Sequence, residues 1–249
     1  MPATPRLLLL PGAWMGSWIW EPTVERLRSR GVGADTLTLR GLEADPPPDT
    51  GAITLADHVT QVLDVLGAGD TPVTLVSHSY SGVVAAQVAD RAPALVDGVV
   101  HVGGFLPRDG RSLLDDWGDS RAAREQEADD IAAAGNLWPA PTDEVLRTVP
   151  DLTAEDRRHL TRGFRDHPGS TVLDPARMTR PVAEQPTTYV ALSPHGHEDA
   201  WATAPAPARD ADAWRRRTLT SGHWPMVSQP DAVADLLTTE AHHYAAQAG

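Results

Sequence analysis

The sequence contains no cysteine and no lysine, and each absence excludes a class of function. Without cysteine there is no disulfide framework, no thiol nucleophile and no thiolate metal site. Without lysine, all 21 basic residues are arginines; they stand against 34 acidic residues and leave a formal net charge of -13. An acidic chain without a basic tract is a poor match for nucleic acid or an anionic membrane, so we expect neither as a partner.

Long apolar runs are missing as well. The run from Leu7 to Leu10 is too short for the hydrophobic region of a signal peptide, and no stretch approaches the roughly 20 apolar residues of a membrane span. We therefore expect a cytoplasmic protein, monomeric or homodimeric, that acts on a small molecule. The 249 residues are enough for one domain that carries an insertion.

Short apolar segments alternate with helical patterns along most of the chain. Strands that are apolar throughout and separated by helices indicate a parallel sheet covered on both faces, which is an α/β fold. A final helix, capped by Ser228, follows the last strand. The expected strands are 6–10, 35–39, 73–76, 96–102, 187–192 and 214–219, and the first three helices are 22–30, 55–66 and 82–90.

The segment 107–186 differs from the rest of the chain in composition, because it contains clusters of charged residues and several prolines. We expect helices near 120–134 and 153–165 and no strand. The sequence therefore predicts a core formed by residues 1–106 and 187–249, with a helical lid inserted at 107–186. The large apolar side chains of the lid either attach it to the core or line an apolar pocket. They are Trp117, Leu137, Trp138 and Phe164.

The stretch Ser77-His78-Ser79-Tyr80-Ser81 separates a short apolar strand from a helical pattern. A nucleophile on a sharp strand-to-helix turn needs small residues two positions to either side, because the turn brings their Cβ atoms against the backbone. This pattern makes Ser79 a candidate nucleophile. The alternative is a group of serines that caps an ordinary helix.

A serine hydroxyl is a weak nucleophile unless a base removes its proton, and histidine suits that task. His223 is the best candidate, because it follows a short strand and lies between Gly222 and Pro225. His78 is a poor base, since neighbours on a tight turn point apart. His195 and His197 have the spacing of metal ligands, but no further ligand cluster accompanies them. We expect neither a metal nor another cofactor.

A carboxylate usually orients such a histidine. Glu198 and Asp199 precede His223 by 25 and 24 residues, which gives the chain order serine, acid, histidine. Asp109 is a weaker candidate. The alternative for Glu198 and Asp199 is a pair of acidic residues at a helix N-terminus.

The negative charge that develops on a carbonyl oxygen needs hydrogen-bond donors that are already in place. The backbone N–H of Tyr80, at the start of a helix, is one candidate. The backbone N–H of Ala13, directly after the Pro11-Gly12 turn, is the other. A plain turn is the alternative explanation of Pro11-Gly12.

Three stretches together resemble the α/β-hydrolase superfamily: Leu7 to Trp18, Ser77 to Gly82, and Ser221 to Met226. The resemblance is greatest to the small-lid group of esterases, methylesterases and hydroxynitrile lyases. It implies that Ser79 is the nucleophile, His223 the base, and Ala13 and Tyr80 the oxyanion donors. The sequence departs from the group in three places. Pro11 replaces a histidine, Ser77 and Ser81 replace glycines, and no unmistakable acid follows Leu192.

The main hypothesis is a cofactor-free serine hydrolase that cleaves a small ester or thioester through an acyl-enzyme. One alternative is a lyase or cyclase of small-molecule biosynthesis that uses His223 as an acid–base. Another is a non-catalytic protein that binds a small ligand. Four tryptophans are candidates for the substrate-binding wall: Trp14, Trp117, Trp138 and Trp224.

Overall fold

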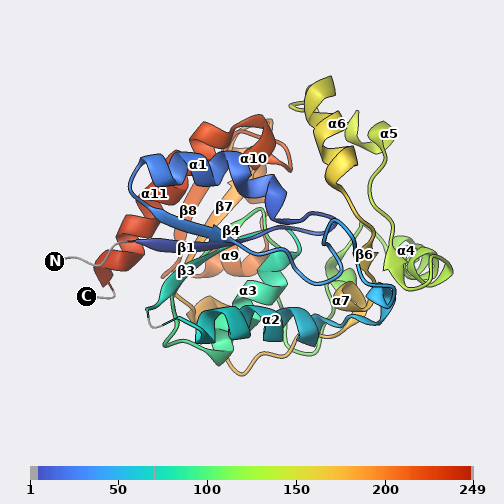
Figure 1. Cartoon of the computed structure of the whole chain (residues 1–249), viewed down its shortest axis with the longest axis horizontal. Coiled ribbons are helices and arrows are strands. Elements are labelled where there is room, and N and C mark those ends of the chain that lie inside the picture. The colour runs from blue at the N-terminus through green and yellow to red at the C-terminus, as the bar shows by residue number, and fades with distance from the viewer. Residues whose placement is uncertain (1–4, 70, 248–249) are drawn as a thin grey trace.

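A six-stranded parallel sheet forms the centre of the protein (Figure 1). The computed structural model describes residues 5–69 and 71–247, and for residues 198 and 199 the backbone only. The strand order is β2-β1-β3-β4-β7-β8, and every neighbouring pair is parallel. The strands are β1 (Arg6–Leu10), β2 (Gly33–Thr36), β3 (Val73–His78), β4 (Val96–Val102), β7 (Thr187–Leu192) and β8 (Arg215–Leu219).

Helices cover both faces of this sheet, as the unbroken apolar strands predicted. The helices α1 (Glu21–Ser29) and α11 (Pro230–Gln247) lie on one face, and α2 (Leu55–Gly67) and α3 (Ser81–Arg91) on the other (Figure 1). All six residues of β3 are buried, as are all the residues of α3 except its last, Arg91. The predicted α/β fold is confirmed, and α3 starts from the middle of the sheet.

Two local predictions were wrong. The second strand, expected at 35–39, occupies Gly33–Thr36, because Arg6 to Leu9 pair with these four residues. The final helix is not capped by Ser228, because Ser228 ends a short α10 (Pro225–Ser228); Pro230 lies in the first turn of the long helix, as expected. Smaller elements complete the core: η1 (Ser17–Trp20), η2 (Thr50–Ala52), α8 (His197–Ala202) and α9 (Ala206–Asp210).

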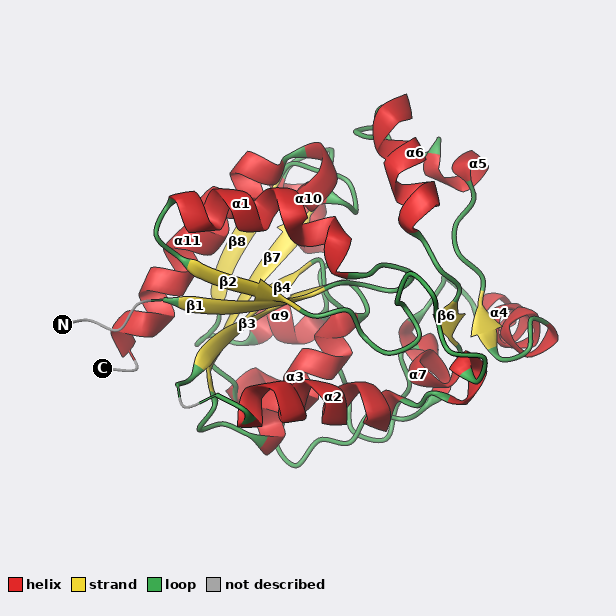
Figure 2. Ribbon diagram, viewed as in Figure 1, coloured by secondary structure: helices red, strands yellow, loops and turns green. Residues whose placement is uncertain are grey.

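The chain between β4 and β7 forms a mostly helical insertion. Its helices α4, α5 and α6 stand beyond the end of the sheet, beside β5 and β6 (Figure 2). The expectation that this segment has no strand was wrong: β5 (Leu137–Trp138) and β6 (His167–Pro168) pair antiparallel over two residues each. The elements are η3 (Leu114–Asp116), α4 (Arg121–Ala133), β5 (Leu137–Trp138), α5 (Asp143–Leu146), α6 (Ala154–Gly163), β6 (His167–Pro168), α7 (Ser170–Leu173) and η4 (Val182–Glu184). The lid boundaries at 107 and 186 stay a prediction.

No helix among the described residues has the length and apolar character that crossing a membrane requires.

A buried carboxylate ties α11 to the edge of the sheet. The side chain of Glu240 is fully buried and accepts hydrogen bonds from Arg215 (2.6 Å), Arg217 (2.8 Å) and Thr188 (2.7 Å). Burial acts to raise the pKa of Glu240, but these hydrogen bonds and the two guanidinium charges outweigh burial and lower it. Two arginines of the edge strand β8 are therefore stabilised by one buried carboxylate.

Replacing Glu240 by glutamine should lower the free energy of unfolding by roughly 3 kcal/mol, because two arginines lose a buried partner. Urea unfolding followed by circular dichroism measures the change. Glu125→Gln is the matched control: Glu125 pairs with Arg121 four residues away on exposed α4, and such pairs contribute about 0.5 kcal/mol or less. Equal effects of the two substitutions would contradict the role given to Glu240.

Candidate active site

Ser79 lies on a strained turn between β3 and α3. Its φ angle is +51°, in the left-handed region that side chains other than glycine rarely adopt. Two contacts with the end of β4 hold the turn: the Ser79 N–H donates to the Val102 carbonyl (3.3 Å), and the Ser79 carbonyl accepts from the Phe105 N–H (3.0 Å). The predicted strand–turn–helix is therefore present, and Ser79 is its most constrained residue.

The two serines that flank this turn each have a structural partner. Ser81 Oγ accepts from the His78 N–H and donates to the Leu10 carbonyl, both at 3.0 Å, and so joins the turn to the end of β1. Ser77 Oγ lies 2.7 Å from His101 Nδ1. The small residue that the turn needs next to Ser81 is Gly82, where a Cβ would lie 2.3 Å from the Phe105 carbonyl oxygen. Glycine at the two flanking positions is therefore unnecessary.

His223 reaches the Ser79 hydroxyl from the loop after β8. Its Nε2 lies 3.1 Å from Ser79 Oγ, although 144 residues separate the two along the chain. Removal of the ring from water lowers the pKa of His223 to about 4, so the imidazole is neutral at pH 7. A neutral imidazole at this distance can accept the hydroxyl proton. The structure therefore brings together the two side chains that the sequence selected.

His78, the poor candidate base, instead braces the loop of His223. Its Nε2 donates to the His223 carbonyl (2.7 Å), and its ring lies 4.8 Å from the His223 ring. Burial, together with the nearby His223, holds the pKa of His78 well below its usual range. This neutral side chain connects the Ser79 turn directly to the histidine loop.

The Pro11-Gly12 turn passes directly against the Ser79 turn. A Cβ at Gly12 would lie 2.8 Å from His78 Nδ1 and 3.0 Å from the Ser79 Cβ, so glycine is what permits the approach. Among the described residues, the backbone N–H groups of Ala13 and Tyr80 donate to no partner. Both predicted donors therefore lie in chain segments that contact Ser79 and keep their N–H groups available.

Two buried histidines hold the residues around these donors. His58 Nε2 donates to the Arg40 carbonyl (2.8 Å), and His58 Nδ1 accepts from the Tyr80 hydroxyl (2.8 Å). His167 Nδ1 accepts from the Trp14 N–H (3.4 Å), and its ring lies 4.5 Å from the Tyr80 ring. Sequence reasoning missed both histidines, because their partners are distant in the chain and no local motif marks them.

No described carboxylate contacts the His223 ring. Glu198 and Asp199 lie on α8, after β7, but their side chains are outside the described part of the chain, so their role stays a prediction. The weaker candidate Asp109 accepts from the Met178 N–H (3.0 Å). His197, considered as a metal ligand, has its Nδ1 2.7 Å from the Thr218 hydroxyl.

The four candidate tryptophans belong to one aromatic cluster. Trp14 packs on Trp138 with ring centroids 4.4 Å apart, Trp138 contacts Trp117 at 5.1 Å, and Trp224 contacts the His223 ring at 4.9 Å. Phe164 lies between Trp14 and Trp224, at 6.5 and 6.3 Å. The cluster therefore runs from the lid to His223 and attaches the lid to the core, and the substrate-binding role of the four tryptophans stays a prediction.

A cavity of about 270 Å³ reaches His223 from the carboxyl ends of β4 and β7. Such ends are where α/β sheets bind ligands. The cavity has space for a small organic group beside the histidine. Its lining includes Gly104, Phe105, Tyr189, Leu192 and Pro205.

A serine on a strained turn after the third strand, facing a histidine after the last strand, is the arrangement of α/β-hydrolase enzymes. The sequence profile of the alpha/beta hydrolase family matches residues 7–236, and the chain belongs to this family. Its predicted membership is thereby confirmed.

Several relatives carry esterase names. A "Carbendazim hydrolyzing esterase" from Nocardioides sp. (strain SG-4G) is 34% identical over 108 residues, which are 43% of this chain and 45% of that protein. "Methylesterase 7" from Arabidopsis thaliana is 29% identical over 41% of this chain and 40% of its own length. These matches span less than half of either relative. "Probable hydrolase R7" from Phoma sp. (strain ATCC 20986 / MF5453) is 24% identical over 95% of this chain and 98% of its own length.

Solved structures agree with the fold over nearly the whole chain. An extracellular alpha/beta-hydrolase from a Paenibacillus species superposes with a TM-score of 0.79 at 20% identity, covering 94% of this chain and 98% of that one. Tomato Methylketone Synthase I superposes with a TM-score of 0.73 at 16% identity, covering 97% of this chain and 98% of that one. At these identities the likeness shows the fold alone.

Proposed function

We propose that the protein is a cofactor-free serine esterase that cleaves a small ester or thioester with an apolar acyl or alcohol part. The observation that carries the proposal is the 3.1 Å contact between Ser79 Oγ and His223 Nε2 on the strained turn. The esterase and methylesterase names of the relatives support the same reaction class.

In the first half-reaction, Ser79 Oγ attacks the carbonyl carbon of the ester while its proton moves to His223 Nε2. The N–H groups of Ala13 and Tyr80 stabilise the oxyanion of the tetrahedral intermediate. When the intermediate collapses, the bond to the alcohol oxygen breaks and His223 returns the proton to that oxygen. In the second half-reaction His223 takes a proton from water, and the resulting hydroxide attacks the acyl-enzyme. The bond between the acyl carbon and Ser79 Oγ then breaks, His223 returns the proton to Ser79 Oγ, and the acid leaves.

The aromatic cluster supports an apolar substrate. Its tryptophans and Phe164 contact one another and, through Trp224, the ring of His223. The cavity beside His223 is lined mainly by apolar and aromatic side chains, among them Phe105, Leu192 and Pro205, which supports the same substrate character.

A fluorophosphonate probe at neutral pH should label the wild-type protein once, on Ser79, because the probe reacts only with an activated serine. Intact mass followed by peptide mapping measures the adduct. Ser79→Ala should remain unlabelled, and Ser77→Ala should keep the label, since Ser77 contacts His101 rather than His223. An unmodified wild-type protein, under conditions that label a known serine hydrolase, would contradict the proposal.

A lyase or cyclase is the second candidate. The observation that favours it is that no described carboxylate touches the His223 ring, so His223 could act as an acid–base without an acyl-enzyme. One relative is named "Alpha-hydroxynitrile lyase", from Arabidopsis thaliana, at 28% identity over 102 residues. The short contact between Ser79 and His223 argues against the third alternative, a binding protein without catalysis.

A further inference from the structure

A carboxylate from the lid accepts hydrogen bonds from the loop that carries His223. Asp151 lies in the bend between α5 and α6, and its Oδ2 accepts three hydrogen bonds. The donors are the Gly222 N–H (2.8 Å), the Ser221 hydroxyl (3.0 Å) and the Ser228 hydroxyl (2.8 Å). These donors lie on both sides of His223 in the chain. The carboxylate therefore links the two ends of the loop from Ser221 to Ser228.

The contact is close enough to dictate the residue at position 222. A Cβ added to Gly222 would lie 2.2 Å from Asp151 Oδ1 and 2.9 Å from the Val149 side chain. A side chain at position 222 would therefore displace the Asp151 carboxylate from its present position. Ser221 and Gly222 are themselves buried beneath this contact.

The carboxylate is held as an anion by neutral groups. Burial acts to raise the pKa of Asp151, but the hydrogen bonds from Gly222, Ser228 and Ser221 outweigh burial and lower it. No described arginine or histidine pairs with Asp151, and its Oδ1 is buried without a described partner. A half-buried anion that depends on three donors loses much of its stabilisation when the bend moves away.

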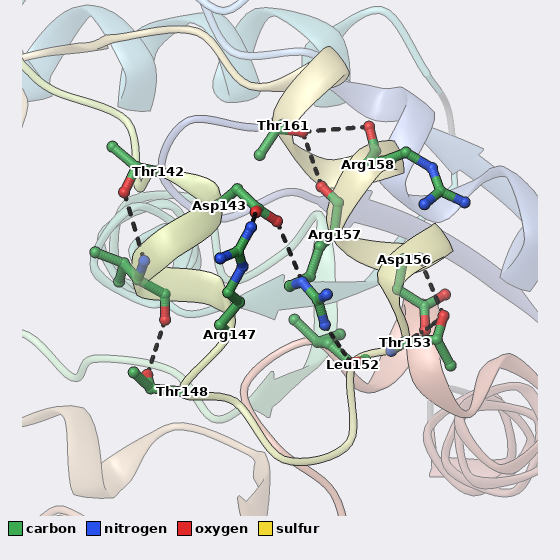
Figure 3. A network of polar contacts seen from close by, with 11 residues as sticks. Thr142, Asp143, Arg147, Thr148, Leu152, Thr153, Asp156, Arg157, Arg158 and Thr161 are labelled. Carbon is green, nitrogen blue, oxygen red and sulfur yellow. Dashed lines mark hydrogen bonds and ion pairs between the residues drawn. The ribbon is translucent and has the colours of Figure 1, made fainter.

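The bend that carries Asp151 is itself fixed within the lid. Asp143 on α5 pairs with Arg147 (2.6 Å) and with Arg157 on α6 (3.2 Å), and Arg157 also donates to the Leu152 carbonyl (3.1 Å) (Figure 3). Leu152 is buried directly after Asp151. These contacts therefore fix the position of the bend that carries Asp151 within the α5–α6 hairpin.

We propose that Asp151 is a positioning residue that places His223 against Ser79 when the α5–α6 hairpin is seated on the core. His78 holds the His223 carbonyl from the core side, and Asp151 holds both ends of the loop from the lid side. This inference rests on the proposed function, because it assigns Asp151 to the geometry of that reaction. It makes the hairpin part of the active-site framework rather than only a cover.

The test compares wild type, Asp151→Ala, Asp151→Asn and Glu144→Gln in the full chain. The two readouts are the rate constant for fluorophosphonate labelling of Ser79 and amide hydrogen exchange in the peptide from Thr220 to Gln229. Glu144→Gln is the matched control, since it removes an exposed carboxylate from the same hairpin and neither the ion pairs of Asp143 nor the His223 loop involve Glu144. All rates are measured well below the unfolding temperature of each variant.

Asp151→Ala should slow labelling by roughly 10²-fold, the loss that a displacement of about 1 Å produces, and should speed exchange at Gly222. Asp151→Asn should lie in between, because its amide oxygen still accepts hydrogen bonds without the charge. Glu144→Gln should leave both readouts close to wild type. Should Asp151→Ala fail to fold, Ser228→Ala removes one of the three donors and should slow labelling roughly fivefold.

Labelling and exchange of Asp151→Ala equal to wild type would overturn the proposal, and so would equal losses in Asp151→Ala and Glu144→Gln. The latter result would reduce Asp151 to a general stabiliser of the lid. A wild-type protein that does not react with the probe would instead remove the proposed function. In that event the exchange measurement still decides whether Asp151 orders the His223 loop.

Discussion

Replacing Ser79 by alanine should reduce ester turnover by about 10⁴-fold or more, with KM for the ester nearly unchanged. The reason is that the variant loses the atom that forms the acyl-enzyme and keeps the N–H groups of Ala13 and Tyr80. Alanine fits the turn sterically, since Ser79 already has a positive φ angle and serine carries the same Cβ. Steady-state kinetics on a chromogenic ester of a short fatty acid measures the loss.

Two further variants make this result interpretable. Ser77→Ala keeps Ser79 and should retain most of the activity, whereas His223→Gln removes the proton acceptor and should lose nearly as much as Ser79→Ala. On the protein's natural substrate, substantial turnover by Ser79→Ala combined with loss in His223→Gln would favour the lyase or cyclase alternative. Turnover that survives both substitutions would remove both residues from the chemistry.

Mild acid should unfold the protein cooperatively near pH 5, well above the range in which carboxylates alone cause unfolding. Four histidines are fully buried and neutral: His58, His78, His101 and His167. Burial lowers the pKa of His58 to about 4 and that of His101 to about 3, and it holds those of His78 and His167 well below their usual value. At pH 5 the unfolded chain therefore binds protons that the folded state does not.

The free energy of unfolding falls as pH falls because the unfolded chain binds more protons than the folded state. A histidine whose folded pKa is depressed leaves stability intact above the unfolded value of about 6.5 and removes it as pH falls below that value. For His58, a shift from 6.5 to about 4 costs about 2 kcal/mol at pH 5. The other three buried histidines act in the same direction, against a total stability of about 5–15 kcal/mol for an ordinary domain.

Guanidinium unfolding at a series of pH values from 7 to 5 measures this dependence. His101→Gln should flatten the slope by up to about 1.4 kcal/mol per pH unit, with the full effect near pH 5, because one proton fewer is taken up on unfolding. His195→Gln, at an exposed position, is the substitution control. A free energy of unfolding that stays constant between pH 7 and 5 would contradict the neutral, buried state of these side chains.

The parts of the fold and site that could be predicted from the sequence are those encoded locally. Val73 to Gly82 specifies a strand, a turn and a helix within ten residues, and the structure forms all three there. His223 was identifiable because a small residue and a proline confine its loop after the last strand. The replacement of glycine by Ser81 was a departure at the sequence level, and its hydrogen bonds to His78 and Leu10 now account for it.

The parts that sequence reasoning missed depend on distant contacts. Asp151 precedes the Gly222 N–H that it binds by 71 residues, and it sits in a lid bend with no motif. His58 and His167 act on Tyr80 and Trp14, at separations of 22 and 153 residues. The strands β5 and β6 are two residues long, so no period of alternation could reveal them. Each of these features exists only because the tertiary structure brings the partners together.

The most direct test of the proposed acyl-enzyme is rapid-quench mass spectrometry of the wild-type protein mixed with p-nitrophenyl acetate. We expect a transient protein species heavier by one acetyl group, located on Ser79 by peptide mapping, that forms before steady turnover and decays as water hydrolyses it. Release of p-nitrophenol with no acetylated Ser79 at any time, while His223→Gln abolishes that release, would contradict it.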